Sequence, residues 1–200
     1  MNKFILATRN RNKIYEISKI LHNEGIEVVG QVEAGYDADI PETGNTFEEN
    51  ALIKARAIFN LSGAPSIADD SGLEVDALGG MPGIYSARYA GEGAGQQALI
   101  DKILTELKDV RPNRRTARFI CVLACVRKEY EFTVSGICEG EILECERGVS
   151  GFGYDPIFYF RKIDKTFAEL SMSEKNEYSH RGKAVKAFCE KLKSIEKEVK

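Results

Sequence analysis

Apolar residues recur at two different spacings along this chain, and the two spacings predict both helices and strands. One helical face is made of four residues, Ile14, Ile17, Ile20 and Leu21. Gly25 follows and is a natural helix end. Short apolar runs at 4–7 and 26–29 flank this helix and predict buried strands. Strand, turn, helix and strand in this order are typical of α/β proteins.

A second helix is predicted where Thr46 and Glu49 match a capping box. Its buried stripe is predicted to consist of Leu52, Ala55 and Phe59. A short strand at 66–68 then leads into an Asp-Asp-Ser-Gly sequence.

The remainder of the chain continues the mixture of helix and strand. The pattern predicts a glycine-rich loop at 78–95, a helix at 97–107, a β-hairpin of 119–126 with 131–143, a loop at 148–154 and a final amphipathic helix. That helix would bury Ala184, Phe188, Leu192 and Ile195. Because helical crossovers and a hairpin both occur, we expect one α/β domain over residues 1–200 with a mixed central sheet and flanking helices.

Composition narrows the classes of partner. The net charge of −3 gives no general attraction to nucleic acid or to an anionic membrane. No apolar run reaches the length of a membrane span, and the run near the N-terminus is too short for a signal peptide. The five cysteines are odd in number and form no CxxC pair. We therefore expect a cytoplasmic protein with reduced thiols.

A polar, cationic turn separates the first predicted strand from the first helix. Its residues are Thr8, Arg9, Asn10, Arg11, Asn12 and Lys13. Backbone N–H groups and the helix dipole favour anions at a helix start, and three cations add to that attraction. The segment therefore indicates a phosphate-binding turn, although it lacks the pattern of a Walker loop. The alternative is a solvated basic turn in which Asn12 caps the helix.

Two adjacent acids, Asp69 and Asp70, follow the strand at 66–68. Carboxylates this close together are costly unless a cation neutralises them. Their oxygens suit Mg²⁺, which also takes substrate phosphates and water as ligands. The alternative is an aspartate-rich turn with Gly72 at the bend.

The capped helix brings further candidates near Glu42. Asn50 and Lys54 are four residues apart and share one helical face. If that face meets the two aspartates, Glu42 could complete a metal site and Lys54 could steady the acids or a phosphate. The alternative is ordinary surface decoration of a helix.

Two later segments carry groups suited to a nucleotide base. In the first, Phe152, Gly153, Tyr154 and Asp155 combine two aromatic faces with a carboxylate. In the second, Lys175 precedes a helix that Ser179 could cap, which would leave His180 and Arg181 free to donate hydrogen bonds to a ligand. The alternative for the aromatics is that they cap the core.

In combination, these segments resemble the inosine triphosphate pyrophosphatase family. The matching motifs are TRNRNK, ETGNTFEENALIKA, ADDSGLEVDALGGMPGIYSARYAG, GFGYDPIF and FAELSMSEKNEYSHRGKA. They run in order over nearly the whole chain. Many members have glycine at the position of Arg9. The resemblance implies an elongated mixed sheet with two lobes around a nucleotide cleft, in a homodimer.

The resemblance also implies an activity, the hydrolysis of ITP, dITP and XTP to the monophosphate and pyrophosphate. It implies that Glu42 and Asp70 bind Mg²⁺, that Asp70 accepts a proton, and that Asp69 and Lys54 lie at the same centre. The substrate-binding residues that it implies are Thr8 to Lys13, Ser71, Phe152 to Asp155, Lys175, His180 and Arg181.

On this hypothesis water attacks the α-phosphorus and pyrophosphate leaves. A cationic donor such as Arg181 or His180 would favour the 6-oxo group of hypoxanthine or xanthine over the amino group of adenine. Two alternatives remain: a regulator that binds nucleotides without cleaving them, and a pyrophosphatase for modified pyrimidine nucleotides. The second should lack the SHRG and GFGYDP motifs, and this chain has both.

Overall fold

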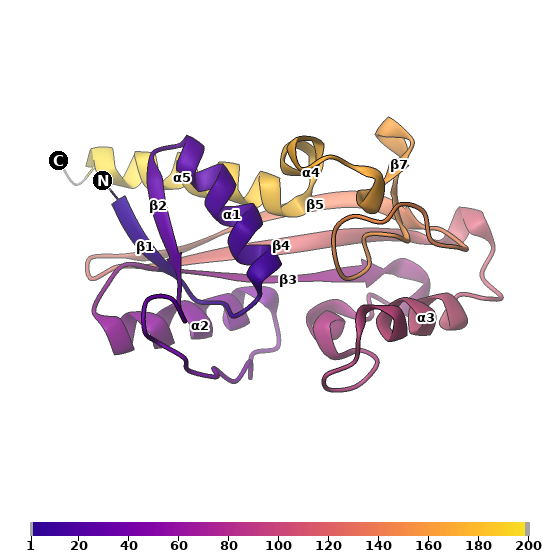
Figure 1. The fold of residues 1–200 in the computed structure, drawn as a ribbon, viewed down its shortest axis with the longest axis horizontal. Helices are drawn as coiled ribbons and strands as arrows, with labels where there is room; N and C mark the ends of the chain where they lie inside the picture. The colour runs from indigo at the N-terminus through magenta and orange to yellow at the C-terminus, as the bar shows by residue number, and fades with distance from the viewer. Residues whose placement is uncertain (1, 199–200) are drawn as a thin grey trace. The chain divides into compact units, whose positions relative to one another are not determined.

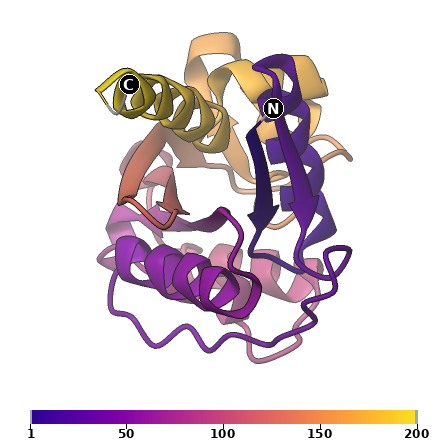
Figure 2. The same cartoon turned by 90° about the vertical axis from the view of Figure 1, so that its left-hand side faces the viewer.

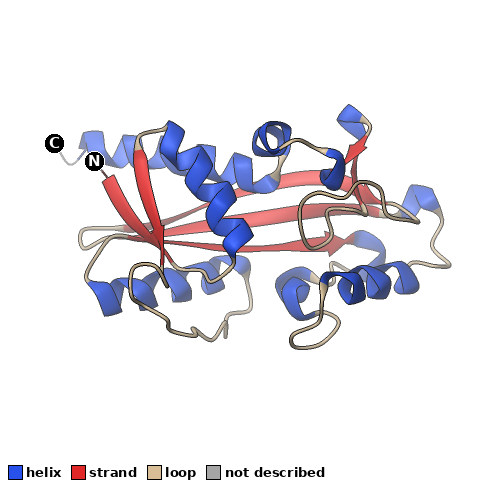
Figure 3. Ribbon diagram, in the orientation of Figure 1, coloured by secondary structure: helices blue, strands red, loops and turns tan. Residues whose placement is uncertain are grey.

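The computed structural model describes residues 2–198, which form a mixed α/β fold (Figure 1). The five α-helices of this part of the chain are α1 (Arg11–Asn23), α2 (Phe47–Ser62), α3 (Gln96–Glu106), α4 (Met172–Tyr178) and α5 (His180–Glu198). The strands are β1 (Asn2–Leu6), β2 (Ile26–Gly30), β3 (Ser66–Val75), β4 (Thr116–Val126), β5 (Glu131–Ile142), β6 (Phe158–Phe160) and β7 (Lys165–Thr166). Short 3₁₀ turns and loops connect them (Figure 3).

The strands form one sheet in the order β2-β1-β3-β4-β5-β6-β7. β1 pairs in parallel with both β2 and β3, whereas β6 pairs antiparallel with β5 and with β7. β4 and β5 are neighbours joined by residues 127–130, which confirms the predicted hairpin. The predicted α/β class with a mixed sheet and flanking helices is therefore confirmed.

The chain divides into two compact units. Unit 1 contains residues 1–70, 121–136 and 179–200, and unit 2 contains residues 71–120 and 137–178. Each unit has its own cluster of buried apolar side chains. The extent of a single domain over residues 1–200 stays a prediction.

The core of unit 1 lies between its part of the sheet and the helices α1 and α5. Phe4 and Leu6 of β1, Ile67 of β3 and Leu123 of β4 belong to this cluster. The helices contribute Ile17, Leu21, Ala184, Val185, Phe188 and Leu192. In Figures 1 and 2, α2 lies on the opposite side of these strands from α5. Successive residues of a strand in unit 1 therefore face different helices.

The core of unit 2 is built around aromatic side chains. Phe119 stacks on Phe167 with ring centroids 5.6 Å apart, and Phe158 packs edge-on against Phe167 at 4.8 Å. Leu99, Ile100 and Ile103 of α3 belong to the same cluster. The helix predicted at 97–107 is thus confirmed as an element that packs against this core.

Helix α1 begins earlier than its predicted cap. The side chain of Asn10 accepts hydrogen bonds from the backbone N–H groups of Asn12 and Lys13, at 3.0 and 3.2 Å. Asn10 is therefore the N-cap, and the alternative that assigned this role to Asn12 is wrong. An Asx side chain satisfies the N–H groups two and three residues later, which places the cap at residue 10. The predicted end holds, since Gly25 follows the helix with φ +75°.

The predicted capping box of α2 is half present. Thr46 accepts from the N–H of Glu49 at 3.1 Å, but the Glu49 carboxylate accepts from Asn45 at 2.6 Å and so caps one residue earlier. The predicted buried stripe is also shifted, because Leu52 and Phe59 are only partly buried. The buried residues are Phe47, Asn50, Ala51, Lys54, Ala55 and Ile58. The shift follows the polar pair Asn50 and Lys54, which share one face of α2 as predicted and are both buried.

The strand predicted at 66–68 is too short. β3 runs from Ser66 to Val75 and contains both aspartates and Gly72. The alternative of an aspartate-rich turn is therefore wrong, because the chain remains extended through this segment. Apolar spacing alone does not show this continuation, since two charged residues interrupt the run.

The final helix and the cysteines agree with most expectations. Ser179 accepts from the N–H of Gly182 at 3.1 Å and so caps α5. Ala184, Phe188 and Leu192 are buried, whereas Ile195 is only partly buried. None of the five cysteines, all of which lie within residues 2–198, forms a disulfide, and Cys145 is the exposed one. Within residues 2–198, no helix is long and apolar enough to span a membrane.

The close approach of β5 to α5 depends on Gly136. A Cβ atom at this position would overlap the carbonyl oxygen of His180 and the backbone nitrogen of Ala184. We predict that Gly136→Ala lowers the free energy of unfolding by about 2 kcal/mol, since backbone atoms must shift to admit the methyl group. Urea unfolding measures this change. The control is Ser135→Ala at the adjacent exposed position, and equal midpoints for both variants would contradict the prediction.

Candidate active site

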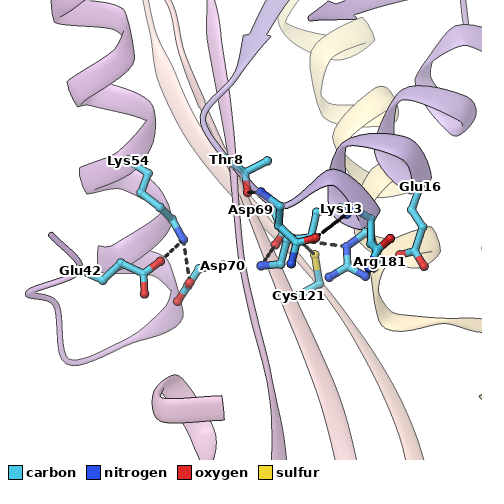
Figure 4. A network of polar contacts seen from close by, with 11 residues as sticks. Thr8, Lys13, Glu16, Glu42, Lys54, Asp69, Asp70, Cys121 and Arg181 are labelled. Carbon is cyan, nitrogen blue, oxygen red and sulfur yellow. Dashed lines mark hydrogen bonds and ion pairs between the residues drawn. The ribbon is translucent and has the colours of Figure 1, made fainter. Parts of the chain in front are cut away.

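Asp69 and Asp70 point to opposite faces of β3, because side chains alternate along a strand. Figure 4 shows Asp70 beside Lys54 and Glu42, and Asp69 beside Lys13, Arg181 and Cys121. All of these residues belong to unit 1. The two acids that are adjacent in sequence therefore enter two separate clusters.

In the first cluster, Lys54 joins two carboxylates. Its Nζ donates to Asp70 Oδ1 at 2.8 Å and to Glu42 Oε1 at 2.5 Å. The side chain of Asn50 accepts from the N–H of Gly44 at 2.8 Å and so holds the backbone two residues after Glu42. Asn50 and Lys54 thus act from one face of α2, as their spacing predicted.

The protonation states follow from burial and from these contacts. Burial raises the pKa of the Asp70 carboxyl, Lys54 and Lys13 lower it, Glu42 raises it, and the net direction is upward. Burial lowers the pKa of Lys54, but Asp70 and Glu42 outweigh it and the pKa is raised. Lys54 therefore stays charged, while Asp70 is a stronger base than an exposed aspartate.

One oxygen of Asp70 is available to a ligand. Asp70 Oδ2 is buried and has no hydrogen-bond partner among residues 2–198. A buried polar atom in this state is explained by strain, by a catalytic role or by a bound water or ion. Within the same residues, no group of three or more His, Cys, Asp or Glu side chains is positioned to hold a metal. Mg²⁺ commonly uses one or two carboxylates plus water and substrate phosphates, and the pair Glu42 and Asp70 fits that pattern.

In the second cluster, Asp69 is completely enclosed by donors. Lys13 forms an ion pair with Oδ1, Arg181 Nε donates to Oδ2 at 3.2 Å, and Cys121 Sγ donates to Oδ2 at 3.0 Å. Burial raises the pKa of Asp69, but Lys13 and Arg181 outweigh it and hold the pKa well below its usual range. Asp69 is therefore a permanent anion whose charge is used to hold two cations.

Arg181 is the second buried cation of this cluster. It is 2% exposed, and its Nη1 donates to Glu16 Oε2 at 2.6 Å. Burial lowers the pKa of Arg181, but Asp69 and Glu16 raise it, so the guanidinium stays charged. Both His180 and Arg181 are buried at the start of α5. Their predicted role as hydrogen-bond donors to a ligand stays a prediction.

The cationic turn contains groups with different surroundings. Thr8 Oγ1 accepts from the N–H of Asn10 at 3.2 Å, which tightens the turn before α1. Arg9 is exposed and pairs with Asp37 at 3.0 Å. Arg11 and Asn12 are exposed at the helix start, whereas Lys13 turns inward to Asp69. The turn therefore lies directly beside the Asp69 cluster.

Unit 2 contains the side chains that are suited to binding a nucleotide base. Asp155 Oδ2 accepts from Lys175 Nζ at 2.6 Å and from the N–H of Phe152 at 2.8 Å. The Lys175 ammonium also lies 4.8 Å from the centroid of the Phe152 ring. A Cβ atom at Gly151, which has φ +80°, would overlap the Asp155 carboxylate. The structure thus brings Phe152, Asp155 and Lys175 together, as expected.

Tyr154 does not belong with those three residues. It is 3% exposed, lies in the core of unit 2, and donates its hydroxyl to the carbonyl oxygen of Ser86 at 2.9 Å. Its expected role as a stacking surface is wrong for this structure, because the ring is already packed. Gly153 lies in the same loop with φ +62°, and Ser71 follows Asp70 on β3 and is partly buried.

Sequence reasoning missed Glu16 and Cys121. A signal for Glu16 exists, since Lys13, Glu16 and Ile17 share one face of α1. A charged residue within an apolar stripe is rarely buried without a partner. Cys121 gives no such signal, because a cysteine in a strand is usually a small buried hydrophobe.

These features define a class: an α/β protein in which paired acids and lysines lie next to a cationic strand–helix turn. The chain belongs to the Ham1 family, which matches residues 4–191. The expected resemblance to inosine triphosphate pyrophosphatases is thereby confirmed.

Relatives and solved structures support this assignment along nearly the whole chain. A dITP/XTP pyrophosphatase of Bacillus subtilis (strain 168) is 49% identical over 97% of this chain and 98% of the relative. The Staphylococcus aureus Ham1 protein superposes with a TM-score of 0.86 at 42% identity, covering 97% of this chain and 100% of that one. A HAM1 protein from Coxiella burnetii gives a TM-score of 0.87 at 42% identity with the same coverage.

We predict that Glu16→Gln lowers the free energy of unfolding by about 3 kcal/mol, because the buried Arg181 loses a charged carboxylate partner. The matched control is Glu24→Gln. Glu24 also forms an ion pair with α5, to Lys193 at 2.7 Å, but this pair is exposed and should contribute under about 1 kcal/mol. Denaturant titration compares the two, and a similar small loss for both would contradict the structural role of Glu16.

Proposed function

We propose that this protein is a magnesium-dependent pyrophosphatase for non-standard purine nucleoside triphosphates. Its substrates would be dITP, ITP and XTP, and its products the monophosphate and pyrophosphate. Membership of the Ham1 family and the 49% identical dITP/XTP pyrophosphatase support the activity.

The observation that carries the proposal is the state of Asp70. One of its oxygens is fixed by Lys54, and the other is buried without a hydrogen-bond partner among the described residues. Burial raises the pKa of this carboxylate, so it accepts a proton more readily than an exposed aspartate does. A protein that only senses phosphates needs no such base.

Glu42 and Asp70 would hold Mg²⁺, which when bound neutralises charge that develops on the phosphates. In the reaction, Asp70 orients a water molecule and takes its proton as the water oxygen bonds to the α-phosphorus. The bond between the α-phosphorus and the bridging oxygen breaks, and pyrophosphate leaves. Lys54 keeps Glu42 and Asp70 in place during this step. The cationic turn around Arg11 would hold the phosphate chain.

Base selectivity would use donors that suit a 6-oxo purine. Phe152 offers a ring, and Lys175 and Asp155 offer a donor and an acceptor. We propose that Arg181 or His180, which carry donor groups, donates to the 6-oxo group of the base, where the amino group of adenine would leave that donor unpaired. We also propose a cytoplasmic homodimer.

We predict that the purified protein releases pyrophosphate from dITP and XTP in the presence of Mg²⁺, and much less from dATP and dGTP. Pyrophosphate and orthophosphate are measured separately for each nucleotide, with and without EDTA. Orthophosphate release would contradict the proposed bond cleavage. Binding without any release would favour a regulator, and cleavage confined to modified pyrimidine nucleotides would favour the other alternative.

We predict that Asp70→Asn lowers kcat for dITP about 10³-fold, because the amide cannot accept the proton. Folding should persist, since the amide oxygen can still accept from Lys54. The control is Asp101→Asn on the exposed side of α3, which should retain full activity. Circular dichroism checks the fold of both variants. Turnover by Asp70→Asn close to that of the parent protein would rule out Asp70 as the base.

A further inference from the structure

The Asp69 cluster contains a polar group without an assigned role, the thiol of Cys121. Cys121 lies on β4, is fully buried, and donates to Asp69 Oδ2 at 3.0 Å. Burial, and after it the neighbouring Asp69 carboxylate, raise the pKa of this thiol well above its usual range. Cys121 is therefore a neutral hydrogen-bond donor and not a nucleophile.

Asp69 connects two cations that come from different helices. Its Oδ1 pairs with Lys13 near the start of α1, and its Oδ2 accepts from Arg181 near the start of α5. The terminal torsion of an aspartate is soft, so rotation of the carboxylate would disturb both contacts. The thiol reaches Oδ2 from β4 and opposes this rotation.

We propose that Cys121 is a positioning residue, which orients the Asp69 carboxylate so that Lys13 and Arg181 are held where the nucleotide needs them. This inference rests on the proposed function. It also gives Asp69 a task different from that of Asp70: Asp69 arranges cations, and Asp70 acts on water.

The chain supplies a matched control in Cys125. It lies four residues further along β4, on the same face as Cys121, is also fully buried, and belongs to the same apolar cluster. Cys125 makes no side-chain hydrogen bond to another residue within 2–198. Substitution of Cys125 therefore reports the cost of removing a buried sulfur alone.

The experiment compares Cys121→Ala and Cys121→Ser with Cys125→Ala and Cys125→Ser. Cys121→Val, which fills the space without a donor, replaces the alanine variant if thermal unfolding shows a reduced folded fraction. Initial rates of pyrophosphate release give kcat and KM for dITP. A loss of folded protein lowers the apparent kcat alone, because KM does not depend on the concentration of active enzyme. Displacement of Lys13 should instead raise KM.

We expect Cys121→Ala to lower kcat/KM about fivefold with a raised KM, which corresponds to one hydrogen bond. Cys121→Ser should restore most of this loss, since a hydroxyl can donate to Asp69. Both Cys125 variants should keep the parent KM. The inference is overturned if Cys121→Ala matches Cys125→Ala in KM, or if the serine variant is as impaired as the alanine variant. If the parent protein released no pyrophosphate from dITP, that result would instead contradict the proposed function.

Discussion

The alternation of side chains along β3 is the constraint on which the site depends. An extended strand sends neighbouring residues to opposite faces, so Asp69 and Asp70 cannot share one environment. One face is covered by α1 and α5, and the other by α2. The same acidic dipeptide is therefore given two different sets of cations. Repulsion between the adjacent carboxylates is reduced because each of them forms ion pairs on its own face of β3.

The two environments produce opposite acid–base behaviour. Two strong cation contacts stabilise the charge of Asp69, and its pKa falls despite complete burial. Burial and the neighbouring Glu42 raise the pKa of Asp70 and outweigh the lowering by Lys54 and Lys13, so its pKa rises. Two identical residues thus have pKa values that are shifted in opposite directions. Pairs of titratable groups whose surroundings separate their pKa values often mark acid–base chemistry.

The sequence predicted the helices and strands more accurately than it predicted the contacts between side chains. The helices at α1, α2 and α5, the hairpin and the mixed sheet follow from apolar spacing. The length of β3 does not, because Asp69 and Asp70 interrupt the apolar run that marks a strand. The sequence predicts Tyr154 as a stacking surface, yet its ring is packed in the core of unit 2 and its hydroxyl donates to Ser86. The buried ion pairs of Arg181 with Asp69 and Glu16 also have no signal in the sequence. Tertiary packing decides these cases, and a single sequence shows only which residue types are available.

The ammonium of Lys54 lies between Glu42 and Asp70, and this position affects what the chain needs in order to fold. Small zinc domains stay unfolded until metal arrives, because their ligands repel one another or lie apart without it. Here an internal cation already balances the carboxylates, at 2.5 and 2.8 Å. The carboxylates therefore do not need a metal ion to be balanced in the folded chain. The Mg²⁺ proposed for this site would bind to a chain that is already folded, and it could arrive together with the nucleotide.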